Sequence, residues 1–255
     1  MRVAVMVNGA AGRMGRLVAT ELRRAGLGDV AGCDPAARPP LHLDDGPLDL
    51  VENLVVGVQT EGVVVDFSHP MATPALVRAA RERHARLVIG TTGQSPEQLR
   101  AIEAAAREVP VVLARNFSIG INRLVQVLPG LGVLARHGFD VECIEAHHRQ
   151  KRDAPSGTAG LLLDALLGPD APRVHGRHGA EARRAPGEVG VHSLRAGEIP
   201  GEHTLVLAGD HEVIEVRHRA LDRTAFASGV VPAVRFVGHH APGLYTMSDV
   251  MGDVG

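Results

Sequence analysis

The sequence predicts an α/β protein: a doubly wound Rossmann-type domain with a parallel sheet, interrupted by an inserted α+β domain with a mostly antiparallel sheet. Two observations carry this prediction. In the first half of the chain, short apolar runs alternate with segments whose apolar residues recur at helical spacing, which indicates crossover units on a parallel sheet. In residues 191–220, short alternating runs are separated by Pro-Gly and Gly-Asp turns, which is typical of antiparallel strands.

The elements up to residue 47 follow from their patterns. Residues 2–7 are a short apolar run of the kind found in buried parallel strands. Residues 13–26 have apolar side chains at helical spacing and end at Gly26, a residue type common at helix C-termini. Residues 29–34 predict a second strand, and the Pro- and Gly-bearing residues 35–47 predict a loop.

The same alternation continues to residue 118. The expected strands are 62–68, 86–93 and 109–118, and the expected helices are 74–85 and 95–108. The second helix starts with a capping box, because Ser95 stands at the N-cap, Pro96 at N1 and Gln98 at N3.

After about Ser118 the pattern changes. The expected elements are a helical stretch at 121–138, a strand-like segment at 140–148, a helix at 156–167, a loop at 168–190, a helix at 224–239 and a last strand at 243–250. We therefore predict that residues 1–117 and 229–255 form a dinucleotide-binding domain and that residues 118–228 form a second domain.

Composition and charge limit the function classes. The chain has 255 residues, 45% of them hydrophobic and 22% charged, with a formal net charge of −2. This balance gives no electrostatic argument for a nucleic-acid or membrane partner. Apolar runs such as 63–65 are far shorter than the roughly 20 residues that span a bilayer. Met1 leads almost directly into a strand-like segment, so we expect no signal peptide. The isolated Cys33 and Cys143 fit a reduced, cytoplasmic compartment.

A glycine-rich loop lies between the first strand and the first helix. In this GxxGxxG pattern, Gly9 permits a tight turn, Gly12 allows backbone to approach a pyrophosphate, and Gly15 allows close packing of helix on strand. Asp34 ends the second strand, where a carboxylate can bind the ribose hydroxyls. Three glycines alone would mark only a turn, but with strand, helix and Asp34 all in register the pattern favours dinucleotide binding. Residues 90–93 (GTTG) and 114–118 (ARNFS) end later strands at the same carboxyl edge.

The densest chemistry lies in residues 145–160, EAHHRQKRDAPSGTAG. His147 and His148 can supply a general acid that titrates near neutrality, and Lys151 adds a second donor or an anion contact. The chain has 14 histidines, so a surface or core role is the usual alternative for any one of them. A metal site is disfavoured because no third ligand stands at a metal-like spacing, and we expect none.

The same segment continues into a helix start. Ser156 and Thr158 offer hydroxyls, and Gly157 and Thr158 offer backbone N–H groups, which together can bind a carboxylate. The alternative is an ordinary helix cap. Donor, cation and anion site within one short segment favour a catalytic site for an anionic substrate over an ordinary cap.

Lys151 is also unusual because the other basic residues of the chain are arginines. Of the 27 basic residues, 26 are Arg and Lys151 is the one Lys. Such a bias towards Arg usually reflects coding composition, so a position that keeps Lys indicates a need that a guanidinium does not meet. Chance placement in a surface loop is the alternative, and the position between His147 and Ser156 argues against it.

Seven motifs carry a resemblance to a known family. They are GAAGRMG (9–15), DFSHP (66–70), GTTG (90–93), ARNFS (114–118), EAHHRQKRDAPSGTA (145–159), RAGEIPGEHT (195–204) and TAFASG (224–229). In order and spacing they resemble the 4-hydroxy-tetrahydrodipicolinate reductases, long called dihydrodipicolinate reductases, nearly end to end. The resemblance implies NADH or NADPH as hydride donor, 4-hydroxy-tetrahydrodipicolinate as substrate, tetrahydrodipicolinate and water as products, and a homotetramer assembled through the sheets of the second domain, which would also bind substrate.

The resemblance also assigns roles by position. His147 and Lys151 would act on protons, and His148, Gly157 and Thr158, next to Ser156, would bind substrate. The cofactor would be lined by Gly9, Ala10, Ala11, Gly12, Arg13, Met14, Asp34, Gly90, Thr91, Thr92, Ala114, Arg115, Asn116 and Phe117. One position departs from the pattern, because some members place Arg directly after the acidic ribose ligand and this chain has Pro35. The expectation for NADPH is weakened by this, although Arg38 and Arg13 lie near.

Two other functions remain open from the residues. One is another two-domain reductase, such as an amino-acid dehydrogenase of the homoserine or aspartate type, against which HHxxK followed by DAPSGT argues. The other is a non-catalytic dinucleotide sensor, which would need no histidine and lysine beside an anion site. The fold alone does not separate these functions.

Overall fold

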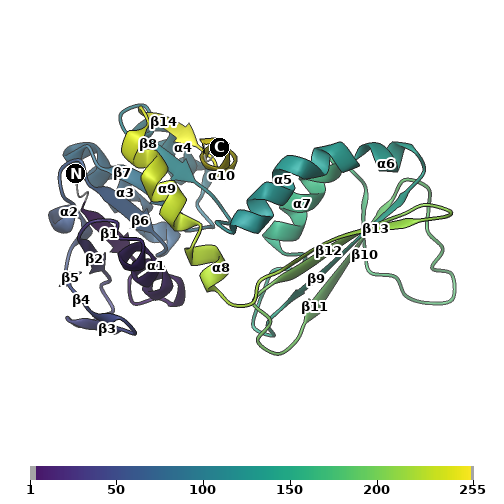
Figure 1. Ribbon diagram of the computed structural model, residues 1–255, viewed down its shortest axis with the longest axis horizontal. Helices are drawn as coiled ribbons and strands as arrows, with labels where there is room; N and C mark the ends of the chain where they lie inside the picture. The colour runs from purple at the N-terminus through teal and green to yellow at the C-terminus, as the bar shows by residue number, and fades with distance from the viewer. Residues whose placement is uncertain (1–3, 254–255) are drawn as a thin grey trace. The chain divides into compact units, whose positions relative to one another are not determined.

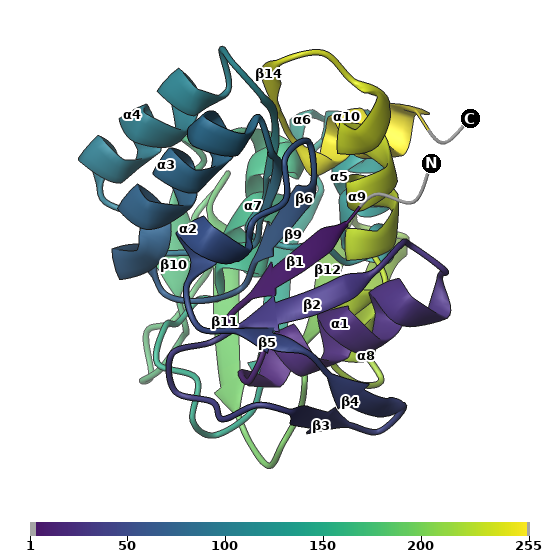
Figure 2. The same cartoon turned by 90° about the vertical axis from the view of Figure 1, so that its left-hand side faces the viewer.

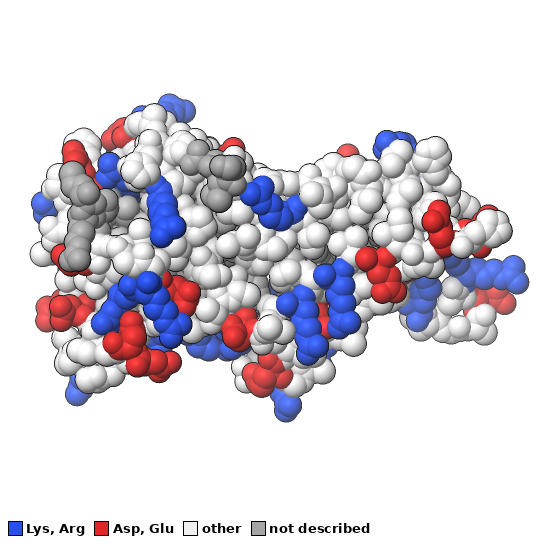
Figure 3. Space-filling model, in the orientation of Figure 1, with Lys and Arg blue, Asp and Glu red and all other residues white. Residues whose placement is uncertain are grey.

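The computed structural model describes residues 4–253, and the chain forms two compact units (Figure 1). One unit contains the chain up to Ile119 together with the segment from Arg223 onward, and the other contains Gly120–Asp222. Among the described residues, no helix is both long and apolar enough to cross a bilayer. Acidic and basic side chains are interspersed over the face shown in Figure 3.

The first unit is built on a parallel sheet in the order β14-β8-β7-β6-β1-β2-β5. Every pairing in this sheet is parallel. The strands are β1 (Val5–Asn8), β2 (Val30–Cys33), β5 (Leu50–Val51), β6 (Val63–Asp66), β7 (Arg86–Ile89), β8 (Pro110–Leu113) and β14 (Gly243–Tyr245). The strand order reverses between β1 and β6, so the sheet has the switch point at which open α/β sheets bind ligands.

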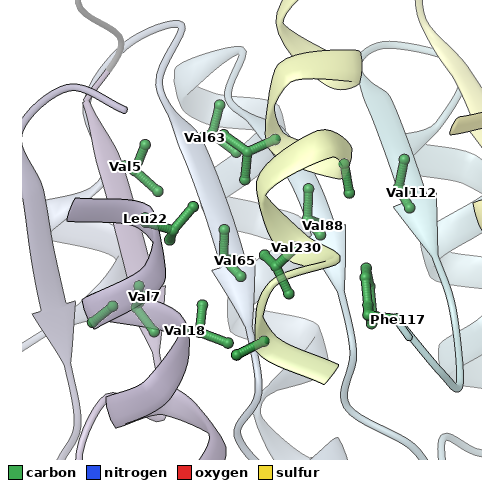
Figure 4. Close-up of a cluster of buried hydrophobic side chains, with 14 of the residues drawn as sticks. Val5, Val7, Val18, Leu22, Val63, Val65, Val88, Val112, Phe117 and Val230 are labelled. Carbon is green, nitrogen blue, oxygen red and sulfur yellow. The ribbon is translucent and has the colours of Figure 1, made fainter. Parts of the chain in front are cut away.

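Helices cover both faces of this sheet. Along β1, Val5 and Val7 face one helix layer and Met6 faces the other, since successive strand residues point to opposite sides. One layer contains α1 (Arg13–Arg24), α8 (Thr224–Ala227), α9 (Val230–His239) and α10 (Met247–Asp253), and Figure 4 shows part of its apolar core. The other contains α2 (Leu54–Gly57), α3 (Thr73–Arg83) and α4 (Pro96–Ala105), with the short 3-10 turn η1 (Pro70–Ala72) before α3 (Figure 2). The predicted doubly wound domain is confirmed.

Two predictions of local structure in this unit were wrong. The expected loop at 35–47 contains most of a hairpin, β3 (Leu41–Leu43) with β4 (Gly46–Leu48), because Leu41 and Leu48 are buried and the chain turns between them. The expected strand at 243–250 ends at Tyr245, because Thr246 caps a helix instead: its hydroxyl and backbone N–H both donate to Asp249 Oδ2 at 2.7 Å.

The second unit is built on a mixed sheet in the order β10-β11-β9-β12-β13. The strands are β9 (Asp140–His147), β10 (Arg173–His175), β11 (Val189–Arg195), β12 (Glu202–Ala208) and β13 (Val213–Arg219). Strands β9, β12 and β13 pair antiparallel, as the turns predict, whereas β9, β11 and β10 pair parallel. The α+β domain is confirmed, with a sheet that is more evenly mixed than predicted and with β10 inside the expected loop.

One face of this mixed sheet packs under helices. These are α5 (Ile119–Leu131), α6 (Val133–Arg136) and α7 (Gly157–Leu167), and they share a core with the inward side chains of the strands. Along β9 the inward residues are Val141, Cys143, Glu145 and His147, all buried. The first two belong to the apolar core, so the buried face changes from apolar to ionisable towards the carboxyl end of β9. A buried charge needs partners, and this end of the strand supplies them.

Candidate active site

The phosphate loop of the first unit has the geometry that its glycines predict. Gly9 lies at φ +80°, and its N–H donates to Cys33 O at 2.8 Å. A Cβ on Gly9 would stand 2.6 Å from Phe67 O, and a Cβ on Gly15 would stand 2.0 Å from Gly9 O. Both contacts are with backbone, so neither position accepts a side chain without moving the loop or α1.

The start of α1 is open to an anion. Among the described residues, no side chain caps its first N–H groups, and both Gly12 and Arg13 are exposed while Met14 is half-buried. Uncapped N–H groups at a helix N-terminus attract phosphate, which is what a dinucleotide site requires here. Ala10, by contrast, is fully buried and shapes the loop from inside.

Asp34 is tied to the same loop. Its Oδ2 accepts from Ala11 N at 3.0 Å, and its Oδ1 accepts from Ala36 N at 2.9 Å. Each carboxylate oxygen keeps a second lone pair, so Asp34 can still accept from ribose hydroxyls. Pro35 and Arg38 are exposed beyond it.

The 90–93 loop is joined to its neighbour by a polar network that sequence reasoning missed. Asp66, almost completely buried, accepts from Asn8 Nδ2 at 2.7 Å and from Ser68 Oγ at 2.5 Å. Ser68 N in turn donates to Thr91 Oγ1 at 2.9 Å. The network fixes the ends of β1, β6 and β7 against one another at the switch point. Thr92 is exposed at this edge, and Gly90, half-buried, would place a Cβ 2.4 Å from the Phe67 ring.

The 114–117 segment divides into outward and inward parts. Arg115 is exposed and Ala114 is half-buried. Asn116 is buried, and its Oδ1 accepts from Ser118 N at 2.8 Å. Phe117 lies in the core with its ring 5.5 Å from that of Phe67. Ala114 and Arg115 therefore offer accessible side chains, whereas Phe117 supports the loop from within.

In the second unit, His147 is paired with a carboxylate. Its Nδ1 lies 2.5 Å from Glu145 Oε2, and the Glu145 side chain is completely buried. Arg195, on the adjacent strand β11, donates to both Glu145 oxygens, at 2.9 and 2.8 Å. This two-bond arrangement is the strong, planar form of an arginine–carboxylate pair.

A second buried histidine stands beside this pair. His203 on β12 is the register partner of Glu145, and its ring lies edge-on to the His147 ring at 5.2 Å. His203 Nε2 pairs with Ser156 Oγ at 3.0 Å, and Ser156 Oγ also caps α7 by accepting from Ala159 N at 3.1 Å. The Ser156 hydroxyl is thus buried and already hydrogen-bonded. Its contribution to a ligand site is therefore to hold the start of α7 in place.

Lys151 and the exposed start of α7 both bind the carboxylate of Asp153. Lys151 Nζ lies 2.8 Å from Asp153 Oδ1, and the backbone of Gly157 also hydrogen-bonds the Asp153 carboxyl. Gly157 is exposed, while Thr158 and His148 are half-buried. A Cβ on Gly157 would meet no atom of the described chain within 4 Å, so open space lies at the predicted anion site.

Burial and charge set the protonation of these groups. Burial lowers the pKa of His147, while the Glu145 hydrogen bond raises it and the Lys151 and Arg195 charges lower it further. Burial alone would raise the pKa of Glu145, but hydrogen bonds from Arg195, Ser193 and His147 hold it at about 2. Burial lowers the pKa of His203 to about 3. Near neutral pH, Glu145 is therefore an anion and His203 is neutral.

Sequence reasoning placed His147, Lys151 and the start of α7 in one segment, and the structure brings them together. It missed Glu145, Arg195 and His203. The sequence could have indicated Glu145, because it is the inward position between Cys143 and His147 in β9. Arg195 and His203 reach the site only through the pairing of β11 and β12 with β9. Within residues 4–253, no cluster of three or more His, Cys, Asp or Glu side chains is arranged to hold a metal ion.

Comparison with known proteins decides the family. The N-terminal model of dihydrodipicolinate reductase matches residues 3–117, and the C-terminal model of the same enzyme matches residues 120–251. The chain belongs to the dihydrodipicolinate reductase family. A 4-hydroxy-tetrahydrodipicolinate reductase from Burkholderia multivorans is 38% identical over 99% of both chains. One from Caldanaerobacter subterraneus is 37% identical over 98% of this chain and 99% of its own.

Solved structures share the fold of this chain. A dipicolinate-bound dihydrodipicolinate reductase from Paenisporosarcina sp. TG-14 is 24% identical, covers 96% of this chain and 98% of its own, and has a TM-score of 0.74. A myo-inositol dehydrogenase from Corynebacterium glutamicum, 14% identical with a TM-score of 0.58 over 98% and 93% of the two chains, shares the fold alone. Membership in the dihydrodipicolinate reductase family confirms the predicted resemblance and makes the chain an oxidoreductase that uses NADH or NADPH.

Proposed function

We propose that this chain reduces 4-hydroxy-tetrahydrodipicolinate to tetrahydrodipicolinate and water, in the diaminopimelate route to lysine, and that residues of β9 and the start of α7 carry the chemistry. The observation that supports the site most strongly is the buried His147–Glu145 pair beside Lys151 and the open N-terminus of α7. A proton donor, a cation and an anion site are what a dicarboxylate that loses water requires.

The first unit has the features that a nicotinamide dinucleotide needs. The uncapped start of α1 fits a pyrophosphate, the bare Cα of Gly9 permits the tight turn, and Asp34 retains lone pairs for ribose hydroxyls. Gly12 to Met14, Thr92, Ala114 and Arg115 would complete the binding surface from accessible positions, with Ala10, Gly90, Thr91, Asn116 and Phe117 shaping it from inside. When bound, NADH or NADPH supplies the hydride.

The second unit supplies the proton chemistry. Ionised Glu145 only accepts hydrogen bonds, so His147 donates from Nδ1 and exchanges its catalytic proton at Nε2. A Cβ on Gly201 would lie 3.2 Å from Nε2, and the absence of that carbon leaves room at this nitrogen. Lys151 would provide the second proton as water leaves and the ring is reduced.

The substrate's carboxylate would bind at the start of α7. Gly157 is exposed and its backbone hydrogen-bonds the Asp153 carboxyl, a bond that the substrate's carboxylate would replace. His148 is half-buried nearby in sequence, and Ser156 holds the helix start in place through its cap. Lys151 would contact the same carboxylate once it releases Asp153. A small-molecule dicarboxylate is therefore the partner that this end of the unit accommodates.

Coupled assay tests the proposal. The product of dihydrodipicolinate synthase is supplied as substrate, and the oxidation of NADH and of NADPH is followed. We expect turnover that depends on the substrate and a loss of roughly 100-fold or more in kcat for His147→Asn. His192→Asn is the matched control, since His192 pairs with Glu142 instead. Absence of turnover with both cofactors, or equal effects of the two variants, would contradict the proposal.

Two further properties belong to the proposal. A homotetramer assembled through the mixed sheet and a cytoplasmic location are supported by the family resemblance and, for the location, by the buried free thiols of Cys33 and Cys143. Sedimentation analysis of the purified protein measures the first, and a monomer at working concentration would refute it.

A further inference from the structure

Glu145 contacts two separate parts of the second-unit site. Its Oε2 accepts from His147 Nδ1 at 2.5 Å, and its Oε1 accepts from Ser156 N at 3.1 Å. One carboxylate therefore contacts both the proposed proton donor and the residue that begins α7. Its third partner, Arg195, binds both oxygens at once.

The burial of this carboxylate is costly in stability terms. Removing a carboxylate and a guanidinium from water is often not repaid by their attraction, and an apolar pair of similar volume is frequently as stable. Val141 and Cys143, the preceding inward residues of β9, show that the strand accommodates apolar side chains on this face. A completely buried charge at the next inward position therefore does something that an apolar residue could not do: it holds two polar groups in place by hydrogen bonds.

The two groups that Glu145 holds are the His147 ring and the backbone N–H of Ser156. Because ionised Glu145 cannot donate, it fixes the His147 proton on Nδ1 and leaves Nε2 as the exchanging atom. Because Oε1 accepts from Ser156 N, the same residue fixes the first turn of α7, which begins at the exposed Gly157. A shift of Glu145 would move the donor and the anion site together.

We infer that Glu145 is a positioning residue that, braced by Arg195, sets the tautomer of His147 and joins it mechanically to the substrate-binding start of α7. The inference rests on the proposed function for its catalytic consequences, while the tautomer and the joining are properties of the chain alone.

Charges around His147 give the direction of the effect. Glu145 on β9 raises the pKa of His147, Lys151 and Arg195 on the following loop and on β11 lower it, and neutral His203 on β12 stands against the ring. Removal of the Glu145 charge leaves the lowering influences unopposed. In Glu145→Gln we therefore expect His147 to titrate at lower pH than in the wild type, and its neutral form to lose the fixed Nδ1–H tautomer.

The first test needs no substrate. Nitrogen chemical shifts of His147 in the ligand-free full chain report both tautomer and titration. Wild type should show the Nδ1–H form, and Glu145→Gln should lose it and titrate lower. An Nε2–H tautomer in the wild type would overturn the inference whether or not any variant folds. So would an unchanged titration in folded Glu145→Gln.

The second test uses turnover. We expect Glu145→Gln to lose roughly 100-fold or more in kcat, to raise KM for the substrate, and to displace the pH profile, while KM for NADH stays unchanged. In the single variant, Arg195 loses its charged partner, which can prevent folding. The double variant Glu145→Gln/Arg195→Gln also removes the arginine charge, so it should fold even if Glu145→Gln does not, and it should show the same kinetic losses. Wild-type kcat and pH profile in either folded variant would overturn the inference.

A control on the same strand separates this role from general ion-pair loss. Glu142 pairs with Arg177, Arg184 and His192, so Glu142→Gln breaks an equally dense cluster. It should leave the His147 titration and kcat near wild type, and an effect equal to that of Glu145→Gln would reduce Glu145 to a structural role. A wild type that does not turn over the substrate would refute the proposed function and leave the spectroscopic result standing.

Discussion

Gly157→Val should separate substrate binding from folding. A Cβ at this position meets nothing within 4 Å in the described structure, and Gly157 is the first residue of α7. Helix propensity favours a side chain over glycine, so stability should change by about 0.5 kcal/mol or less. A carboxylate bound at the Gly157 N–H would, however, meet the isopropyl group. Loss of one charge-assisted hydrogen bond costs about 1.5–3 kcal/mol, which corresponds to a rise in substrate KM of about 10- to 150-fold.

Steady-state kinetics with varied substrate and varied NADH measure this effect, together with the affinity for dipicolinate. KM for NADH should not change, because the phosphate loop belongs to the other unit. Gly160→Val is the matched control: it lies one turn further along α7, where a Cβ would approach the Arg173 guanidinium only to 3.8 Å. Equal damage to substrate and NADH binding, or equal effects at 157 and 160, would refute the reasoning and reduce the helix start to a cap.

Three further outcomes follow from the site. Lys151→Arg keeps a charge beside Asp153 but cannot release a proton, so kcat should fall by roughly 100-fold or more while NADH binding and folding persist; near-normal turnover would leave proton donation to His147 alone. Asp34 repels a 2′-phosphate and Pro35 adds no cation, so kcat/KM for NADH should equal or exceed that for NADPH, and a tenfold NADPH preference would implicate Arg38 or Arg13. Burial lowers the pKa of His203 to about 3, so the unfolded chain binds the extra proton between pH 3 and 6.5 and stability should fall with falling pH across that window. Tm measured against pH should show a shallower slope in His203→Gln, and an identical slope would contradict this cause.

The parts of the fold that local chemistry determines were predicted well from the sequence. The phosphate loop depends on residues close together in the chain, and contact of a Gly15 Cβ with the Gly9 carbonyl explains why that spacing is informative. The prediction of a strand over residues 243–250 was wrong beyond Tyr245, because a short apolar run supports strand and helix equally. The hydrogen bond between Thr246 and Asp249 caps a helix there instead.

The site was predicted only in part, for a physical reason. His147, Lys151 and Gly157 lie within one strand, loop and helix start, so their spacing alone brings them together. Arg195 lies 50 positions from Glu145 and reaches it only because β11 pairs with β9 in one particular parallel register. Parallel pairing is set by the whole core of the unit, and no local pattern specifies it.

The charges in the described part of the second-unit site balance before substrate arrives. Glu145 and Asp153 are anionic and pair with Arg195 and Lys151, while His203 is neutral and burial favours neutral His147. A dicarboxylate bound at Gly157, as proposed, would add two negative charges to this neutral set and would compete with Asp153 for Lys151. Both changes favour a protonated His147, because a nearby anion stabilises the imidazolium. Under the proposed function, burial keeps the histidine neutral in the absence of ligand, and the substrate's own charge would supply the condition under which His147 acts as an acid.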